Sequence, residues 1–230
     1  MNKTFNGESV LSWVLSSLAG LIGSAAFVHT TGYFVTFMTG NTERGILGFF
    51  TNKSEMSKAA ILLIISFVFG VLVASILRRR WWENHPHGAT VLTTLSLAAA
   101  TIVDFAQEGW TRADIPFLPI LFVAFGIGSL NTSFVHNGEV SIPLSYITGT
   151  LVKFGQGIER HINGGTIHDW LGYLLLYASF TAGATLGGAL SLISPSSGML
   201  LSATLTCSVC TIYTYFFADR QAPRQRTRRQ

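Results

Sequence analysis

Two stretches of the chain resemble each other, and they decide the fold. The first is FVHTTGYFVTFMTGNT at residues 27–42, and the second is FVHNGEVSIPLSYITGT at residues 134–150. Each begins with Phe-Val-His and ends in a Thr-Gly motif, and the intervals between the two differ by only two residues. Because self-similarity in a fixed order marks an internal repeat, we interpret the chain as two related halves.

The similarity extends on both sides of these stretches. Upstream, Ile22-Gly23-Ser24 matches Ile127-Gly128-Ser129. Downstream, Phe67-x-x-Gly70-x-x-x-Ala74 matches Phe180-x-x-Gly183-x-x-x-Gly187. Small residues four apart let membrane helices approach closely, so the downstream pairs predict packing seams. Spacing alone leaves open whether the seams lie within one chain or between two.

The composition places both halves in a membrane. Hydrophobic residues make up 49% of the 230 residues and charged residues 11%, against about 25% charged residues in soluble proteins. The mean hydropathy of +0.44 indicates several spans and argues against a soluble domain. Six apolar runs have the length that crosses a bilayer: Val10–Val28, Ser57–Leu77, Ala89–Ala106, Ile115–Phe134, Asp169–Ile193 and Gly198–Phe217.

The basic residues predict the orientation of these spans. With the N-terminus inside, eleven Lys and Arg residues fall on the cytoplasmic side and four outside, which favours cytoplasmic termini. The inside set is Lys3, Arg78, Arg79, Arg80, Lys153, Arg160 and five arginines of the tail at 218–230; the outside set is Arg44, Lys53, Lys58 and Arg112. We interpret the tail as solvated chain near anionic lipid and expect no nucleic-acid partner.

The fold expected is an all-α integral membrane protein, one membrane domain over 1–230 with repeats at 10–106 and 115–217. Three spans in each repeat, an odd number, mean that the second repeat enters the membrane from the opposite side. Inverted repeats of this kind build many secondary transporters, whose substrate site lies near the midplane where the repeats meet. This likeness favours transport only by analogy.

Charge-free chain continues past the first and fourth spans and predicts broken helices there. Gly32 beside Thr30 and Thr31, and Asn137, Gly138 and Pro143, interrupt a helix. Thr39 and Thr148 are placed like N-caps of the short helices that follow, where free amides attract anions or polar groups. The alternative is that they only cap a turn. The substrate-binding residues expected are Thr39, Gly40, Asn41, Asn131, Thr148, Gly149 and Thr150.

Three ionisable residues are candidates for a coupling or proton site. His29 and His136 occupy matching positions of the repeat, and histidine is the residue type suited to carrying protons near neutral pH. Asp104 lies in the third expected span, where an ionisable group is costly and raises the question of function. The alternative is that Asp104 only reaches interfacial water near the end of its span and that each histidine is hydrogen-bonded at the interface.

The two cysteines, Cys207 and Cys210, form a single C-x-x-C in the last span. A thiol oxidoreductase of this type needs a second cysteine pair, so packing is the favoured interpretation. The sequence has no phosphate-binding loop, zinc-protease helix or serine-hydrolase elbow. We therefore expect that the protein is not an enzyme and that it has neither a cofactor nor a metal site.

Several of these residues carry a resemblance to a known family. They are Gly23 with Phe27, the block from Phe34 through Met38-Thr39-Gly40-Asn41-Thr42, Gly128-x-x-Asn131, and Tyr146-Ile147-Thr148-Gly149-Thr150-Leu151. Over nearly the whole chain the sequence is similar to the YoaK family of uncharacterised bacterial multi-pass membrane proteins. The resemblance implies six helices in the bacterial cytoplasmic membrane. The family often has Asp after the glycine that corresponds to Gly23, whereas this chain has Ser24.

The leading functional hypothesis is a small secondary transporter or permease that alternates access about the two Thr-Gly motifs. Its expected partners are membrane lipids, an unidentified small-molecule substrate and a second copy of the chain. The alternative hypothesis is a non-transporting membrane protein that binds a lipid or protein partner.

Overall fold

The computed structural model describes residues 7–30, 32–82, 85, 87–108, 114–136, 138–142 and 144–219. Lys3, Thr31, Arg112, Asn137, Pro143 and the tail from Arg220 onward, all of which entered the sequence predictions, lie outside these residues.

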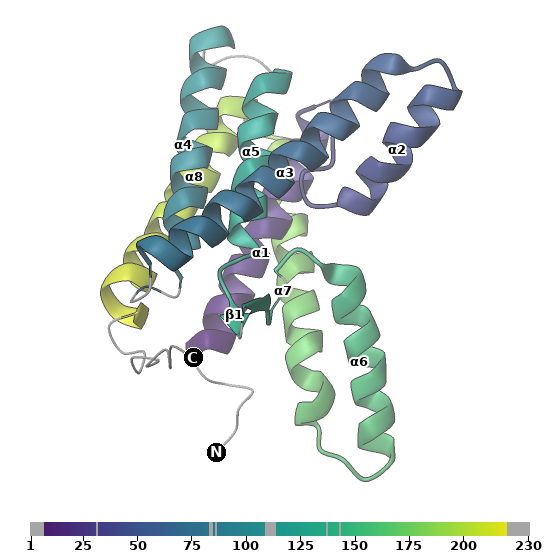
Figure 1. Cartoon of the computed structure of the whole chain (residues 1–230), viewed down its shortest axis with the longest axis vertical. Coiled ribbons are helices and arrows are strands. Elements are labelled where there is room, and N and C mark those ends of the chain that lie inside the picture. The colour runs from purple at the N-terminus through teal and green to yellow at the C-terminus, as the bar shows by residue number, and fades with distance from the viewer. Residues whose placement is uncertain are drawn as a thin grey trace.

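The regular structure of the described residues is helical apart from one small hairpin (Figure 1). Its elements are α1 (Gly7–Val28), α2 (Met38–Phe50), α3 (Ser54–Arg80), α4 (Ala89–Glu108), α5 (Phe117–Leu130), β1 (Val135–His136), β2 (Glu139–Val140), α6 (Ile147–Ile162), α7 (His168–Ser191), α8 (Ser196–Tyr213) and the π-helix η2 (Thr214–Ala218). Among these residues, five helices are long and apolar enough to cross a membrane, namely α1, α3, α4, α7 and α8 with its extension.

Helix α5 differs from the span expected at Ile115–Phe134. It has 14 residues and rises about 21 Å, less than the about 30 Å of a hydrocarbon core. The helix starts after Pro116 and stops at Asn131, whose side chain bonds to Ser145 farther along the chain. Nine of its residues are buried, so α5 is a short apolar helix enclosed by other helices.

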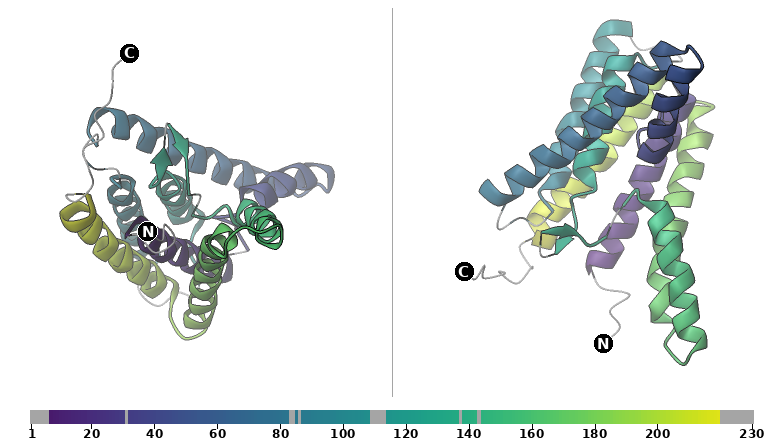
Figure 2. Two further views of the ribbon diagram at one scale, coloured as in Figure 1. Left: turned by 90° about the horizontal axis from the view of Figure 1, so that it is seen from below. Right: turned by 45° about the vertical axis from the view of Figure 1, so that its right-hand side comes forward.

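The two halves of the chain interlock (Figure 1). Helix α1 of the first half packs against α7 of the second, and α3 packs against α5. Helix α4 lies between α5 and α8, while α2 and α6 pack mainly on the helices that follow them, α3 and α7. Figure 1 and the right-hand view of Figure 2 place the α2–α3 turn and the α6–α7 turn at opposite ends of the bundle.

Reciprocal glycine contacts form both inter-half crossings. A β-carbon at Gly183 would collide with the carbonyl oxygen of Ser17, and one at Gly20 with that of Phe180. In the other crossing, Gly70 abuts the carbonyl of Phe125 and Gly128 that of Phe67. The predicted seams at Gly70 and Gly183 therefore lie within one chain.

Packing changes one detail of the sequence alignment. The glycine of α1 that occupies the place of Gly128 is Gly20, one helical turn before Gly23. The sequence match chose Gly23 because Ile and Ser flank both glycines. Gly20 and Gly23 are only three residues apart in α1, so either register is possible from the letters alone.

Threonine pairs link α4 to α8 along their length. Thr94 shares a hydrogen bond of 2.8 Å with Thr211, and Thr101 shares one of 3.0 Å with Thr204. Adding 110 to the residue number turns Thr94 into Thr204 and Thr101 into Thr211. The α4 residue of each pair therefore corresponds to the α8 residue of the other pair. These pairs join two helices for which the sequence motifs gave no match.

The expected breaks after α1 and α5 lie around two glycines with left-handed backbone. Gly32 has φ of +79° and Gly138 has φ of +84°, a conformation that side chains with a β-carbon rarely adopt. Irregular chain then leads to α2 at Met38 and to α6 at Ile147.

Candidate functional site

The Thr-Gly motifs lie in the first turns of α2 and α6. The residues at the N-cap positions are Phe37 and Tyr146, and neither helix has a side-chain cap. Thr39 and Thr148 are the second residues of these helices and are exposed. The prediction that the two threonines are N-caps is therefore wrong, because each helix begins one residue before its threonine.

The glycines of the motifs make room for aromatic rings. A β-carbon at Gly40 would collide with the ring of Phe37, and one at Gly149 with the ring of Tyr146. In each half the aromatic residue three positions before the glycine folds over it, at the start of the helix. This close contact gives the Thr-Gly pairs the same structural role at the start of α2 and at the start of α6.

The residue after each glycine is buried and polar. Asn41 is 1% exposed, and its Nδ2 donates to the carbonyl oxygen of Phe34 at 2.6 Å. Thr150 is also 1% exposed, and its hydroxyl donates to the carbonyl of Tyr146 at 3.3 Å. Asn41 therefore fastens α2 to the preceding irregular segment, whereas Thr150 bonds only within its own turn.

Asn131 gives the second half a tether of a different kind. Its Nδ2 donates to Ser145 Oγ at 2.8 Å, and its Oδ1 accepts from the Ser145 backbone amide at 3.0 Å. In the first half, Gly23 occupies the corresponding place and contacts Thr36, whose Oγ1 would lie 2.7 Å from a β-carbon there. Asn131 thus positions the approach to α6 through Ser145.

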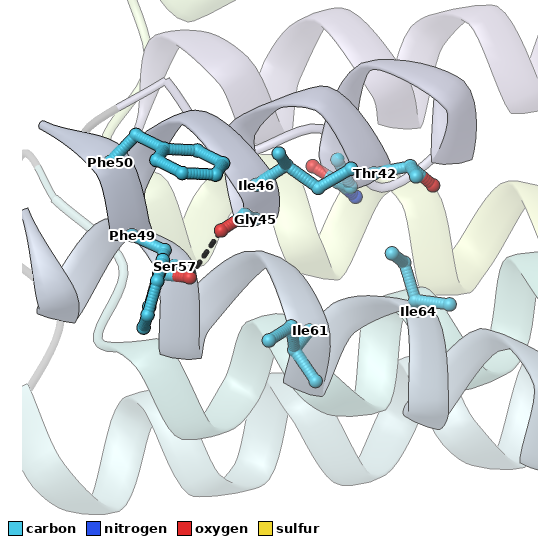
Figure 3. A pocket seen from close by; sticks show the side chains of 9 residues that line it. Thr42, Gly45, Ile46, Phe49, Phe50, Ser57, Ile61 and Ile64 are labelled. Carbon is cyan, nitrogen blue, oxygen red and sulfur yellow. Dashed lines mark hydrogen bonds between the residues drawn. The ribbon is translucent and has the colours of Figure 1, made fainter.

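A first pocket, of about 430 Å³, lies between α2 and α3. Figure 3 shows Ile46, Phe49 and Phe50 on one side, facing Ile61 and Ile64 on the other. Ser57 Oγ donates to the carbonyl of Gly45, and this bond joins the two helices in the same view. Asn41 and Thr42 complete a lining that has no ionisable side chain.

A second pocket, of about 340 Å³, lies among α1, α6 and α7. Its ionisable lining residues are Lys153 and Arg160 of α6 and His168 and Asp169 of α7. Hydroxyl groups and apolar side chains complete the wall: Ser9, Ser12, Ser141, Thr150, Tyr173, Trp13, Ile142 and Leu176, with Gly172. Asn41 and Thr150 therefore line two different pockets.

The three predicted coupling residues lie in unlike surroundings. His29 is 4% exposed just after α1, and its carbonyl accepts from the Ile115 amide at 2.6 Å before α5. His136 is exposed in the hairpin opposite Glu139. The matched positions of the two histidines in the sequence thus do not give matched environments. Asp104 is 1% exposed in the last turns of α4.

The structure adds a cluster that sequence reasoning missed. The carboxylate of Asp219 is buried between two imidazoles, with Oδ1 2.5 Å from His87 Nδ1 and Oδ2 3.5 Å from His85 Nδ1. The ring of His85 stacks on Tyr215 with centroids 4.2 Å apart. Two signals were present, a His-x-His sequence after the second span and an Asp directly after the last one. The predicted topology places both on the same side of the membrane.

Cys207 and Cys210 are buried in α8 as free cysteines. Thr94 donates to Cys207 Sγ at 3.2 Å across the α4–α8 contact. Throughout the residues that the structure describes, no group of three or more His, Cys, Asp or Glu side chains is placed to hold a metal ion.

Comparisons with known proteins identify the family. A family model described as a protein of unknown function (DUF1275) matches residues 11–213. A UPF0700 transmembrane protein of Rhizobium meliloti (strain 1021) is 28% identical over 194 residues, which cover 81% of this chain and 80% of the relative. No solved structure matches the chain.

These findings confirm the expectation of an uncharacterised membrane family, although they give no support to the name YoaK for it. They also agree with the five long apolar helices of the bundle. The chain is a multi-pass membrane protein, and it belongs to the DUF1275 family.

Proposed function

We propose that this protein is a small secondary transporter of the bacterial cytoplasmic membrane, with both ends of the chain inside. The observation that carries the proposal is the pair of pockets beside α2 and α6. Each is lined by the buried polar residue of a Thr-Gly motif, Asn41 in one and Thr150 in the other. The two motif-bearing hairpins turn at opposite ends of the bundle (Figure 1).

Three features of the packing support two related, inverted halves. The inter-half crossings α1–α7 and α3–α5 use the same reciprocal glycine contacts. The threonine pairs between α4 and α8 exchange under one shift in numbering. The aromatic-over-glycine arrangement recurs at Phe37 and Tyr146. Inverted repeats of this kind alternate access by moving one unit against the other.

The short helix α5 supports the same proposal. In secondary transporters, helices that stop within the membrane place polar side chains and helix ends near the substrate, and non-helical backbone at that depth must be enclosed by protein or water. Helix α5 ends at Asn131 among buried residues, and Asn131 bonds to Ser145 just before α6. A movement of α6 would therefore be transmitted to the end of α5.

In the proposed cycle, the α2–α3 and α6–α7 hairpins move in alternation about the glycine crossings. Each movement opens one pocket to its own side of the membrane while the other closes. The close crossings act as pivots because backbone lies directly on backbone there, and the aromatic rings at the starts of α2 and α6 move with their helices.

The test measures solvent access at the two motifs. Single cysteines are placed at Thr39 and Thr148, which are both exposed, after Cys207→Ser and Cys210→Ser remove the native thiols. Membrane-impermeant thiol reagents are applied to proteoliposomes from either side, with and without a proton gradient. The same reagents applied to a cysteine at Thr181, an exposed position in the middle of α7, provide the control.

A transporter predicts that labelling at positions 39 and 148 changes in opposite directions when the gradient is imposed or reversed, while the control stays constant. Labelling that is fixed at both positions under every gradient, in protein shown to be folded, contradicts the proposal. It would favour a static membrane protein that binds a lipid or protein partner.

A further inference from the structure

We propose that the pocket among α1, α6 and α7 binds an oxyanion, the phosphate or carboxylate group of a small molecule or of a lipid headgroup. The inference rests on the proposed function only in that it names the class of substrate. The volume of this pocket, about 340 Å³, lies within the range of about 300–1,000 Å³ that is typical of small-ligand sites.

Two cations of α6 face this pocket. Lys153 and Arg160 are seven residues apart, two helical turns, and therefore lie on one face of the helix. Arg160 Nη2 donates to the carbonyl of Asp169 at 3.4 Å, and Lys153 Nζ lies 5.9 Å from the centre of the Tyr173 ring. Both cations are thus directed toward the first two turns of α7.

Neither cation is neutralised within the described part of the chain. The ion pairs there join Lys58 to Glu55 and Asp219 to His85 and His87. Asp169 is the one carboxylate in the pocket lining, and its Oδ2 accepts from the Thr166 amide at 2.7 Å in the α6–α7 turn. Two cations therefore face one carboxylate that already stabilises a turn, and the pocket carries excess positive charge.

The start of α7 adds to this charge. The pocket is lined by His168, Asp169 and Gly172 from the first turns of a 24-residue helix, and a helix N-terminus carries a partial positive charge that favours anions. Tyr173, in the second turn of α7, and Ser141, before α6, also line the pocket and carry hydroxyl donors. Donors that converge from several sides suit an oxyanion, because it accepts hydrogen bonds at several lone pairs.

Apolar side chains and the motif bound the remainder of the pocket. Ile142 and Leu176 provide apolar walls, which are the usual lining of a ligand site that uses a few polar groups for orientation. Thr150, buried in the first turn of α6, lies in the same wall. An anion held by Lys153 and Arg160 would therefore lie beside the second Thr-Gly motif.

The experiment measures the thermal stability of the full chain, purified in a neutral detergent, at constant ionic strength. The probes are inorganic phosphate, succinate and dihexanoylphosphatidylglycerol, with glycerol and dihexanoylphosphatidylcholine as ligands without net charge. A ligand that binds only the folded state raises the melting temperature, and above its dissociation constant the rise grows with the logarithm of its concentration. We expect the anions to do so and the uncharged controls not to.

Matched variants locate the site. Loss of a charged hydrogen-bond donor costs about tenfold or more in affinity, so Lys153→Gln and Arg160→Gln should each weaken the anion effect by that factor, and the double variant should abolish it. Lys153→Arg keeps the charge and should retain binding. Lys53→Gln makes the same charge change at the α2–α3 turn and should behave as the wild type. The melting temperature without ligand and the elution profile show that each variant is folded.

The outcomes separate the sources of the anion. Stabilisation by phosphate or succinate supports a soluble anion, and stabilisation by the phosphatidylglycerol alone supports a headgroup site. If no anion stabilises the folded wild type, or if the double variant responds as strongly as the wild type, the inference is overturned. Because this readout does not require transport, its failure leaves the accessibility test of the proposed function intact.

Discussion

The α2–α3 and α6–α7 hairpins share a backbone design and differ in chemistry. In each hairpin an aromatic ring lies over a glycine at the start of the short helix, and the residue after that glycine is polar and buried. The long helix of each hairpin packs against a helix of the other half of the chain. The pocket of the first hairpin is lined by Ile and Phe without an ionisable group, whereas the second pocket includes Lys153 and Arg160. Glycine positions thus define the common geometry, and the residues lining each pocket define what it can hold.

The two hairpins also differ in how firmly they are tied. Asn41 bonds α2 to the segment before it, and Arg44 Nη1 donates to the carbonyl of Gly32 in the same segment. Helix α6 has no such bond from Thr150, and its approach is tied to α5 through Asn131. The first hairpin is therefore fastened to the irregular segment just before it, while the approach to the second is fastened to the end of α5.

The sharpest test of the shared geometry replaces one crossing glycine in each half. In Gly183→Ala and Gly70→Ala, the new methyl group would collide with a backbone carbonyl of the opposing helix, at Ser17 and Phe125 respectively. Because backbone yields less than a side chain, we expect a loss of at least about 3 kcal/mol and little folded protein in either case.

Melting temperature and elution profile measure this effect. Gly188→Ala, on the same helix as Gly183, is the matched control, since a β-carbon at Gly188 meets nothing within 4 Å. If Gly70→Ala were tolerated while Gly183→Ala was not, the two crossings would not be equivalent.

A smaller effect should separate the two buried polar residues. Asn41→Leu removes the donor to the Phe34 carbonyl and should cost about 2 kcal/mol, because a partly buried acceptor loses its partner. Thr150→Val keeps the shape and removes a bond within one turn, so its cost should be about 0.5–1 kcal/mol. Chemical denaturation of the purified variants compares them, and equal losses would contradict the asymmetry in tethering.

The aromatic-over-glycine contacts should respond alike at both ends. Gly40→Ala and Gly149→Ala require the ring of Phe37 or Tyr146 to move, and we expect each to cost about 1 kcal/mol. Adding Phe37→Leu to Gly40→Ala, and Tyr146→Leu to Gly149→Ala, should recover part of the loss. A double-mutant cycle measures this recovery as a coupling energy; additive effects would show that the ring and the glycine do not interact.

The smallest expected effects come from the threonine pairs between α4 and α8. Thr101→Val removes one interhelical bond, whereas Thr94→Val removes both the bond with Thr211 and the donation to Cys207 Sγ. Such bonds in membrane proteins are worth about 0.6 kcal/mol each, so unfolding measurements should show a somewhat larger loss for Thr94→Val. Thr206→Val is the control, because its hydroxyl is exposed and bonds within its own helix to Ser202; an equal loss there would assign the effect to helix propensity.

Much of the architecture could be predicted from the sequence because it depends on residue size and apolar run length. The glycine seams at Gly70 and Gly183 and the left-handed turns at Gly32 and Gly138 all lie where the sequence placed close packing or helix breaks. Spacing of small residues identifies the face that packs, but it carries no information on which helix covers it. The pairing of α1 with α7 therefore came from the structure.

The candidate site was predictable only in part. Threonine has a preference for N-caps, and this suggested the position of Thr39, but the contact between Phe37 and Gly40 defines the helix start instead. The pocket cations Lys153 and Arg160 entered the sequence argument only as topological signals. The contact of His87 with Asp219 spans 132 residues, and no local pattern encodes a contact over that distance.

The interlocked halves have a consequence for biosynthesis. Helix α1 leaves the ribosome well before α7, yet Ser24 bonds to Ala184, which is 160 residues later in the chain. At synthesis rates of about 5–20 residues per second, the glycine face of α1 waits roughly 8–30 s for its partner. During that time it must be covered by lipid, by a provisional neighbour or by the insertion machinery. Helix α1 is thus made long before the helix on which it packs.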